Sequence, residues 1–115
     1  MNKSEKKIEN NLVNTLTKVC KISLKEVPGF TWITHFLNYK RFPESLIVVC
    51  VFETNAELAA AKAADDIDFM RDLIHEHLGC ADIKIGDAQQ QIHFDTEEAC
   101  AKEHSGNWQQ RYRQQ

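Results

Sequence analysis

The stretch FTWITHFLNYKRFPESLIVVCVF, residues 30–52, decides the fold. Its first part, residues 30–39, is rich in aromatic and β-branched residues and short of helix formers, so it predicts a strand. Residues 46–52 are apolar without alternation, which is typical of a strand that is central in its sheet or covered on both faces. The segment between them contains Phe42-Pro43 and indicates a loop. A connection this short predicts an antiparallel hairpin.

The segment before the hairpin, residues 4–26, has the pattern of an amphipathic helix. Its apolar side chains fall on one face about 160° wide on a helical wheel; they are Ile8, Leu12, Leu16, Val19, Cys20 and Leu24. The opposite face carries five lysines within about 60° of one another, namely Lys3, Lys7, Lys18, Lys21 and Lys25. Pro28-Gly29 ends this helix, because proline disfavours the α conformation before it and glycine allows a turn.

After the hairpin, residues 54–57 match a capping box and begin a helix that runs to about Leu78. Its alanine-rich first half has a weaker apolar stripe, so the sequence allows either a continuous helix or a kink or break near residues 64–66. Residues 83–85 and 92–94 alternate apolar and polar side chains and form either one interrupted strand or two. Residues 96–98 then begin a short helix that ends near Ser105-Gly106.

This order of elements, α-β-β-α-β-(β)-α, predicts the α+β class: a small antiparallel sheet with helices packed on one face. A chain of 115 residues is long enough for one domain, which we assign to residues 1–106. Residues 107–115 form a tail without periodicity, in which Trp108 and Tyr112 provide a means of docking.

The formal net charge of −3 conceals an uneven distribution along the chain. Residues 1–41 hold eight basic and three acidic side chains, whereas residues 44–103 hold four basic and fourteen acidic ones. The simpler interpretation of this distribution is that two helices have ordinary solvent-exposed faces of opposite charge. The alternative is an anion or nucleic-acid site formed by basic side chains, with candidates Lys3, Lys7, Lys18, Lys21, Lys25, Lys40 and Arg41. The acidic half would repel a duplex that wraps around the protein, which disfavours double-stranded DNA.

Four cysteines, at positions 20, 50, 80 and 100, lie far apart without a CxxC pair. Together with an N-terminus that has no apolar signal region and a chain without a membrane-spanning run, this spacing predicts a cytoplasmic protein with free thiols. One ligand-like spacing exists, because His77 and Cys80 are three apart and Cys100 and His104 are four apart. Two such pairs would form a Cys2His2 zinc site, although a packed histidine and a core cysteine explain the same residues.

A thiol nucleophile is the other chemical candidate. If Tyr39 pairs with Leu46, then His35 lies opposite Cys50, and such a pair can stabilise a thiolate. Cys50, however, sits in the apolar run, where a thiol is usually an inert small hydrophobe. The chain has no glycine-rich phosphate loop, GxSxG or HExxH motif, so we expect no enzyme and no cofactor.

Two stretches, GFTWITHFLNYKRFPESLIVVCVFETN (residues 29–55) and DTEEACAKEHSGNW (residues 95–108), resemble a group of short uncharacterised bacterial proteins sometimes labelled as Fis-type regulators. The Fis label implies a basic C-terminal helix-turn-helix, and residues 56–103 do not resemble one. The order of elements over residues 4–95 is similar to the type II KH arrangement of ribosome-binding factor A. The GxxG loop of that family is missing, because no two glycines are three residues apart.

These observations favour a small non-enzymatic domain that acts through protein contacts, as a homo-oligomer or an accessory subunit. RNA or ribosome association through the lysine face is the alternative, and no membrane partner is expected. A zinc or thiol enzyme is the third hypothesis.

Overall fold

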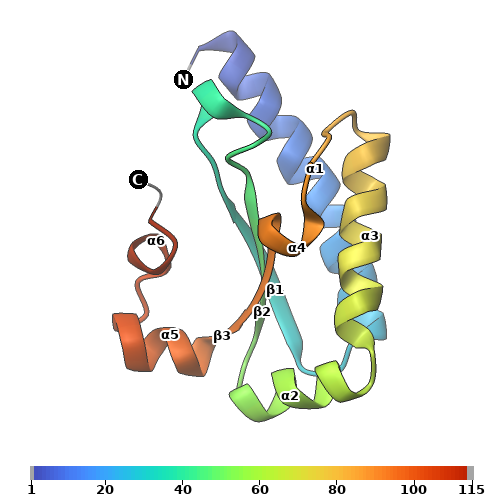
Figure 1. Ribbon diagram of the computed structural model, residues 1–115, viewed down its shortest axis with the longest axis vertical. Helices are drawn as coiled ribbons and strands as arrows, with labels where there is room; N and C mark the ends of the chain where they lie inside the picture. Colours follow the sequence, from blue (N-terminus) through green and yellow to red (C-terminus); the bar gives the residue numbers. More distant parts are fainter. Residues whose placement is uncertain (1, 114–115) are drawn as a thin grey trace.

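A computed structural model describes residues 2–113 of the chain. Helices and a three-stranded sheet form an α+β fold, as the sequence predicts (Figure 1). In chain order the elements are α1 (Lys3–Glu26), β1 (Phe30–Phe36), the 3-10 turn η1 (Tyr39–Arg41), β2 (Ile47–Phe52), α2 (Asn55–Ala63), α3 (Asp66–Cys80), α4 (Ala88–Gln91), β3 (Ile92–Thr96), α5 (Glu97–His104) and α6 (Trp108–Arg111).

The residues that the sequence predicts to begin helices do so in the structure. The Thr54 hydroxyl accepts a hydrogen bond from the Glu57 amide at 3.1 Å and caps α2, and Thr96 caps α5 in the same way through the Ala99 amide at 2.9 Å. The long helix is broken between α2 and α3, where Asp65 takes a positive φ of 62°. The break turns α3 back along α1, so that the two helices lie side by side.

The sheet has the order β1-β2-β3 and is mixed rather than antiparallel. β1 and β2 form the expected antiparallel hairpin, whereas β3 runs parallel to β2. The reason is the long connection through α2, α3 and α4, which returns the chain to the end of the sheet where β2 begins. Residues 83–85 are not a strand; Ile83 and Ile85 are buried in a loop that the Ile83 amide ties to the end of α3.

The hairpin register differs by two residues from the expected one. His35 is paired with Val48, and Ile33 is paired with Cys50. The loop, residues 37–46, is longer than the sequence suggests because η1 and hydrogen bonds between Asn38 and Ser45 keep Tyr39 out of the ladder. A shift of two residues leaves each side chain on its expected face of the sheet.

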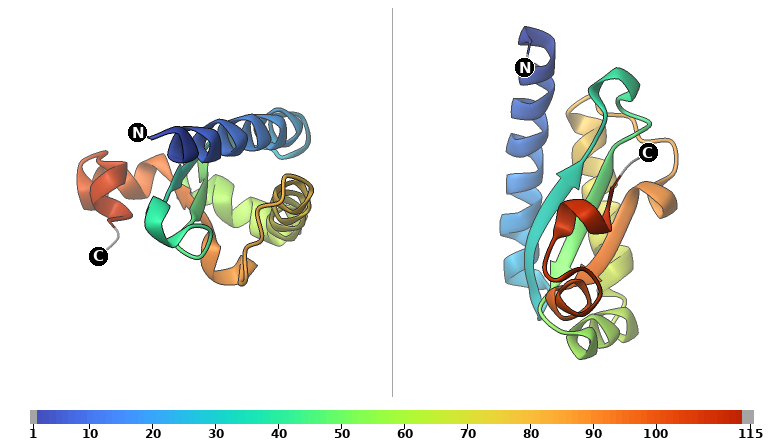
Figure 2. Two further views of the ribbon diagram at one scale, coloured as in Figure 1. Left: turned by 90° about the horizontal axis from the view of Figure 1, so that it is seen from above. Right: turned by 90° about the vertical axis from the view of Figure 1, so that its left-hand side faces the viewer.

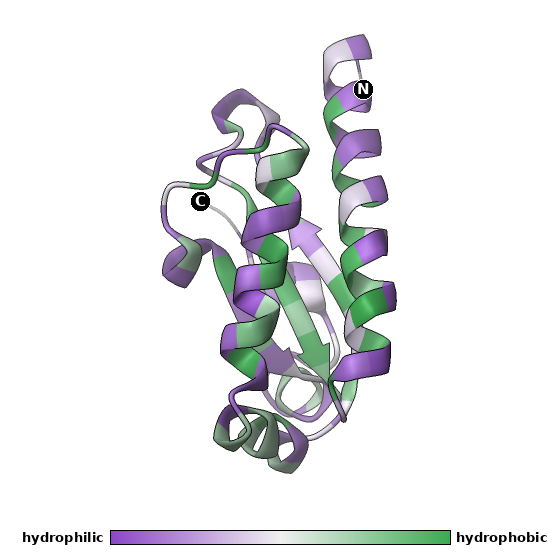
Figure 3. Ribbon diagram, turned by 90° about the vertical axis from the view of Figure 1, so that its right-hand side faces the viewer, coloured by the Kyte–Doolittle hydropathy of each residue, from purple (hydrophilic) through white to green (hydrophobic). Residues whose placement is uncertain are grey.

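One face of the sheet packs on α1 and α3 and forms the main core (Figures 2 and 3). Fully buried side chains there include Leu12 and Val19 of α1, and Met70 and Ile74 of α3. Leu24, which the wheel assigns to the core, is 53% exposed, and Ser23 is buried instead.

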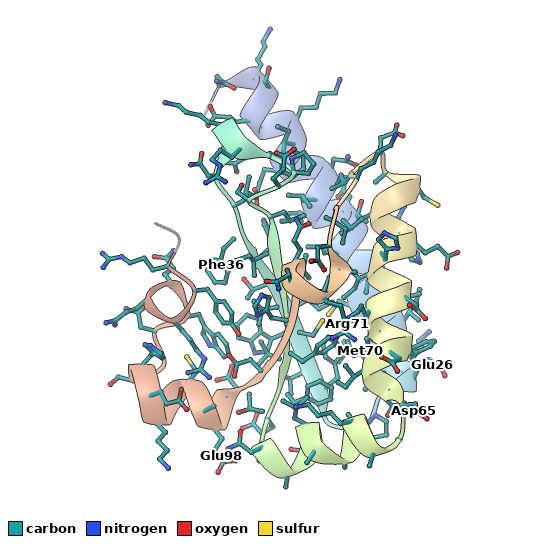
Figure 4. All side chains as sticks on the ribbon, in the orientation of Figure 1. Glu26, Phe36, Asp65, Met70, Arg71 and Glu98 are labelled. Atoms are coloured by element: carbon teal, nitrogen blue, oxygen red, sulfur yellow. The ribbon has the colours of Figure 1, made fainter. Side chains whose placement is uncertain are left out.

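The opposite face of the sheet is covered by α5 and α6, so the helices are not confined to one face (Figure 2). The Trp32 and Trp108 rings meet edge to face at 5.3 Å, and Phe36 stacks on Tyr112 at 5.6 Å. In Figure 4, Phe36 lies on the side of the sheet that faces α6. Residues 107–113, expected as a tail, therefore dock on the sheet; residues 114–115 lie outside the described part of the chain.

Candidate functional site

β1 is an edge strand, since it pairs with β2 alone among the residues that the structure describes. Burial raises the pKa of the Cys20 thiol in α1, and a hydrogen bond from the Ile33 main chain opposes that rise. A main-chain group that lowers a thiol pKa is an N–H donor, so the Ile33 amide points away from β2. Because amides alternate sides along a strand, the His35 amide points to the same open edge.

A groove runs between this open edge and α1. Its floor and walls enclose about 310 Å³ and come from Ile33, Thr34 and His35 of β1 and from one side of α1. The α1 residues are Val13, Leu16, Thr17, Cys20 and Lys21. Val13 is 44% exposed, which gives the groove an apolar wall that the fold itself does not cover.

A second cavity of about 430 Å³ continues the groove around the end of β1. His35 lines both cavities. The far wall comes from the C-terminal segment, and the full lining is Glu9, His35, Phe36, Leu37, Tyr39, Gln109, Tyr112 and Arg113. We call these two adjacent cavities the β1 groove.

Glu9 holds the side chains at the junction of the β1 groove. One of its carboxylate oxygens accepts a hydrogen bond from the Tyr39 hydroxyl at 2.7 Å, and the other lies 2.9 Å from His35 Nε2. The hydrogen bond with Glu9, together with burial and the Glu9 charge, raises the pKa of Tyr39 to about 12. Tyr39 therefore remains a neutral hydroxyl that fixes the carboxylate.

A buried ion pair fixes the far wall. The Arg111 guanidinium donates two hydrogen bonds to the Asp95 carboxylate of β3, one of them 2.9 Å from Nη2 to Oδ1, and the Tyr112 hydroxyl donates a third at 2.6 Å. Burial raises the pKa of Asp95, but the hydrogen bonds from Arg111, Tyr112 and the Thr96 amide, with the Arg111 charge, outweigh it and leave the pKa below its usual value. Asp95 is thus an anion that anchors α6 to the sheet.

The lysines predicted as an anion site are all exposed, as are Lys40 and Arg41 in η1. Most of this face of α1 points to solvent. Lys21 alone of the seven lines the β1 groove, while Lys7 and Lys18 line two neighbouring cavities beside the end of α3, of about 750 and 330 Å³. Asn11 and Asn14 lie between these two lysines and line both cavities.

The four candidate zinc ligands are not brought together. His77 and Cys80 belong to α3, whereas Cys100 and His104 belong to α5 on the other side of the sheet (Figures 1 and 2). His104 accepts a hydrogen bond from Arg111 at 3.1 Å. Within residues 2–113 no group of three histidine, cysteine or acidic side chains is placed to hold a metal ion.

The thiol pair expected at His35 and Cys50 does not form either. His35 is paired with Val48 and bonded to Glu9. Cys50 is completely buried, and burial raises the pKa of its thiol far above the usual range, so that it is not a thiolate at neutral pH.

Sequence reasoning misses most residues of the β1 groove. Glu9 lies in a helix and Tyr39 in a loop, 30 residues apart, and no local pattern links them. Val13 does give a signal, because it is an apolar residue outside the main stripe of its helix.

None of the helices in the described part of the chain combines the length and the apolar composition of a membrane span. Comparison of the chain with protein-family models, with curated proteins and with solved structures finds no match. Its function is therefore inferred from the residues around β1.

Proposed function

We propose that this chain is a small non-enzymatic protein-interaction domain that binds an extended segment of a partner protein along the open edge of β1. The observation that carries the proposal is an edge of β1 that no other strand of the described residues pairs with and that lies beside the exposed Val13 of α1. The Ile33 amide at this edge is bonded to Cys20, so the His35 amide is the donor that the proposal uses. An added strand gains main-chain hydrogen bonds from such an edge and specificity from side-chain pockets next to it.

The composition of β1 supports this role. Edge strands that must not pair usually carry charged side chains or proline. The sequence FTWITHF has neither lysine, aspartate, glutamate nor proline. Its one irregularity, between Phe30 and Trp32, lies at the start of the strand, away from Ile33 and His35. We place this function in the cytoplasm, because the four free thiols suit a reducing compartment.

The test compares two substitutions at one position. His35→Ala and His35→Pro both remove the imidazole, but only proline removes the amide that points to the open edge. The probe is the blocked seven-residue peptide Thr-Val-Thr-Val-Thr-Val-Thr, titrated into 15N-labelled protein. We expect the largest amide shifts in residues 33–37, and about tenfold weaker binding by the proline variant than by the alanine variant, the effect of one main-chain hydrogen bond.

Thermal unfolding of both variants checks that each one is folded. Equal affinities of two folded variants, or shifts that avoid β1, would contradict strand addition. Sedimentation of the unmodified protein separates a heterologous partner from a second copy: dimers that dissociate on His35→Pro would identify the chain itself as the occupant.

RNA binding by α1 is the second candidate, favoured by the cavities that Lys7 and Lys18 line beside the exposed Asn11 and Asn14. The resemblance to the type II KH order of elements points the same way. If this candidate is correct, the double variant Lys7→Glu with Lys18→Glu loses salt-sensitive retention of single-stranded RNA, while Lys102→Glu, an exposed charge change on α5, keeps it. No retention by the unmodified protein at low salt would exclude it.

A further inference from the structure

The β1 groove is basic although the chain is acidic. Two cationic side chains line it, Lys21 on α1 and Arg113 beyond α6. Glu9 is the one acidic side chain among the described residues that line the groove, and both of its oxygens are engaged by His35 and Tyr39. The exposed acids of α3, which include Asp68, Asp72 and Glu76, do not line the groove.

The two cations lie at different places along β1. Lys21 lines the cavity that Ile33, Thr34 and His35 form, whereas Arg113 lines the cavity that His35, Phe36 and Leu37 form. They also approach from opposite faces of the sheet, because Lys21 belongs to α1 and Arg113 follows α6. Side chains of an added strand alternate between the two faces of the sheet. Two residues of the partner segment that reach cations on opposite faces are therefore separated by an odd number of positions. The span from Ile33 to Phe36 fits a separation of about three residues at roughly 3.4 Å each.

We infer that the partner segment is acidic and carries two carboxylates three residues apart, one paired with Lys21 and the other with Arg113. This inference rests on strand addition at β1, the proposed function. It disfavours a second copy of the chain, because antiparallel pairing of two β1 edges would bring two basic grooves against each other.

The experiment uses four blocked peptides and the full chain. The first is Val-Glu-Val-Thr-Glu-Val-Thr, with glutamates three apart; the second, Val-Glu-Val-Thr-Val-Glu-Thr, has the same composition with glutamates four apart. The third and fourth replace both glutamates of the first peptide with glutamine or with lysine. Dissociation constants are measured from 15N shifts at low salt and again at about 150 mM salt.

We expect the first peptide to bind about three- to tenfold more tightly than the glutamine peptide at low salt, and the lysine peptide to bind most weakly. Lys21→Glu and Arg113→Glu should each remove most of that advantage. Lys62→Glu, the same charge change at an exposed position of α2, should leave it intact.

Equal affinities for the glutamate, glutamine and lysine peptides would overturn the inference while leaving strand addition in place, provided that His35→Pro still weakens binding. Equal affinities for the two glutamate peptides would also overturn it, because the spacing would then carry no information. Binding by none of the four peptides would defeat both the inference and the proposed function.

Discussion

Arg111→Ala is expected to lower the free energy of unfolding by about 3–5 kcal/mol, because it leaves the Asp95 carboxylate buried without its cationic partner. The Asp95 side chain is 9% exposed and that of Arg111 is 14% exposed, so water compensates little for the loss. Urea unfolding followed by tryptophan fluorescence measures the change. The same signal reports the undocking of α6, since Trp108 lies against Trp32.

The matched control is Lys102→Ala, an exposed basic residue on α5, which should change the free energy of unfolding by about 0.5 kcal/mol or less. Acid provides a second check. The wild-type pKa of Asp95 is lowered by folding, so its contribution to stability is present at neutral pH and is lost as the pH falls through the folded-state pKa. Without Arg111, its hydrogen bonds and its charge no longer lower the Asp95 pKa, so that pKa lies higher in the variant than in the wild type and protonation relieves the variant first. The difference between the two proteins should therefore shrink from pH 7 to about pH 4, and a constant difference would argue against this ion pair as the cause.

Gly29→Ala is expected to cost about 2–3 kcal/mol of unfolding free energy, from two causes at one turn. Gly29 joins α1 to β1 with φ of +84°, a conformation that side chains disfavour. An added Cβ would also lie 2.9 Å from Glu57 Cβ and 2.9 Å from Glu57 Oε2. Glu57 belongs to the capping box of α2, so its displacement weakens the start of that helix as well.

Gly86→Ala is the control for this prediction, because a Cβ at Gly86 meets no atom within 4 Å. That change should be close to neutral, or slightly stabilising through reduced freedom of the unfolded chain. The midpoints of the denaturant unfolding curves of the two variants, at unchanged m-values, measure the difference in their stability. Similar stabilities of Gly29→Ala and Gly86→Ala would show that the turn adapts to a side chain.

Local patterns predicted the elements that are stabilised by neighbours in sequence. The stripe of α1, the hairpin of residues 30–52 and the cap at Thr96 all follow from residues within a few positions of one another. The weak stripe near residues 64–66 left open the break that the structure has at Asp65. The direction of β3 does not, because it depends on where the two helices of the crossover return the chain. The alternation of apolar and polar side chains at residues 83–85 is typical of a strand, but in the described part of the chain Ile83 and Ile85 pair with no strand.

The groove and the docked C-terminal segment depend on pairs far apart in sequence. Asp95 and Arg111 are 16 residues apart, and neither differs in its surroundings from an ordinary surface charge until the sheet and α6 are in place. Glu9 and His35, which are 26 residues apart, likewise meet only once α1 packs beside β1. The residue types are visible in the sequence, but their partners are not.

The cover that α6 provides has a consequence for synthesis of the chain. Val49 and Val51 are completely buried, on the side of β2 that faces away from α1. Trp108 and Tyr112, which cover the neighbouring Trp32 and Phe36, leave the ribosome more than fifty residues after Val51. At roughly 5–20 residues per second, the nascent hairpin waits several seconds with one apolar face open to water. A polypeptide interrupted before Trp108 keeps that face open and becomes a substrate for chaperones or aggregation.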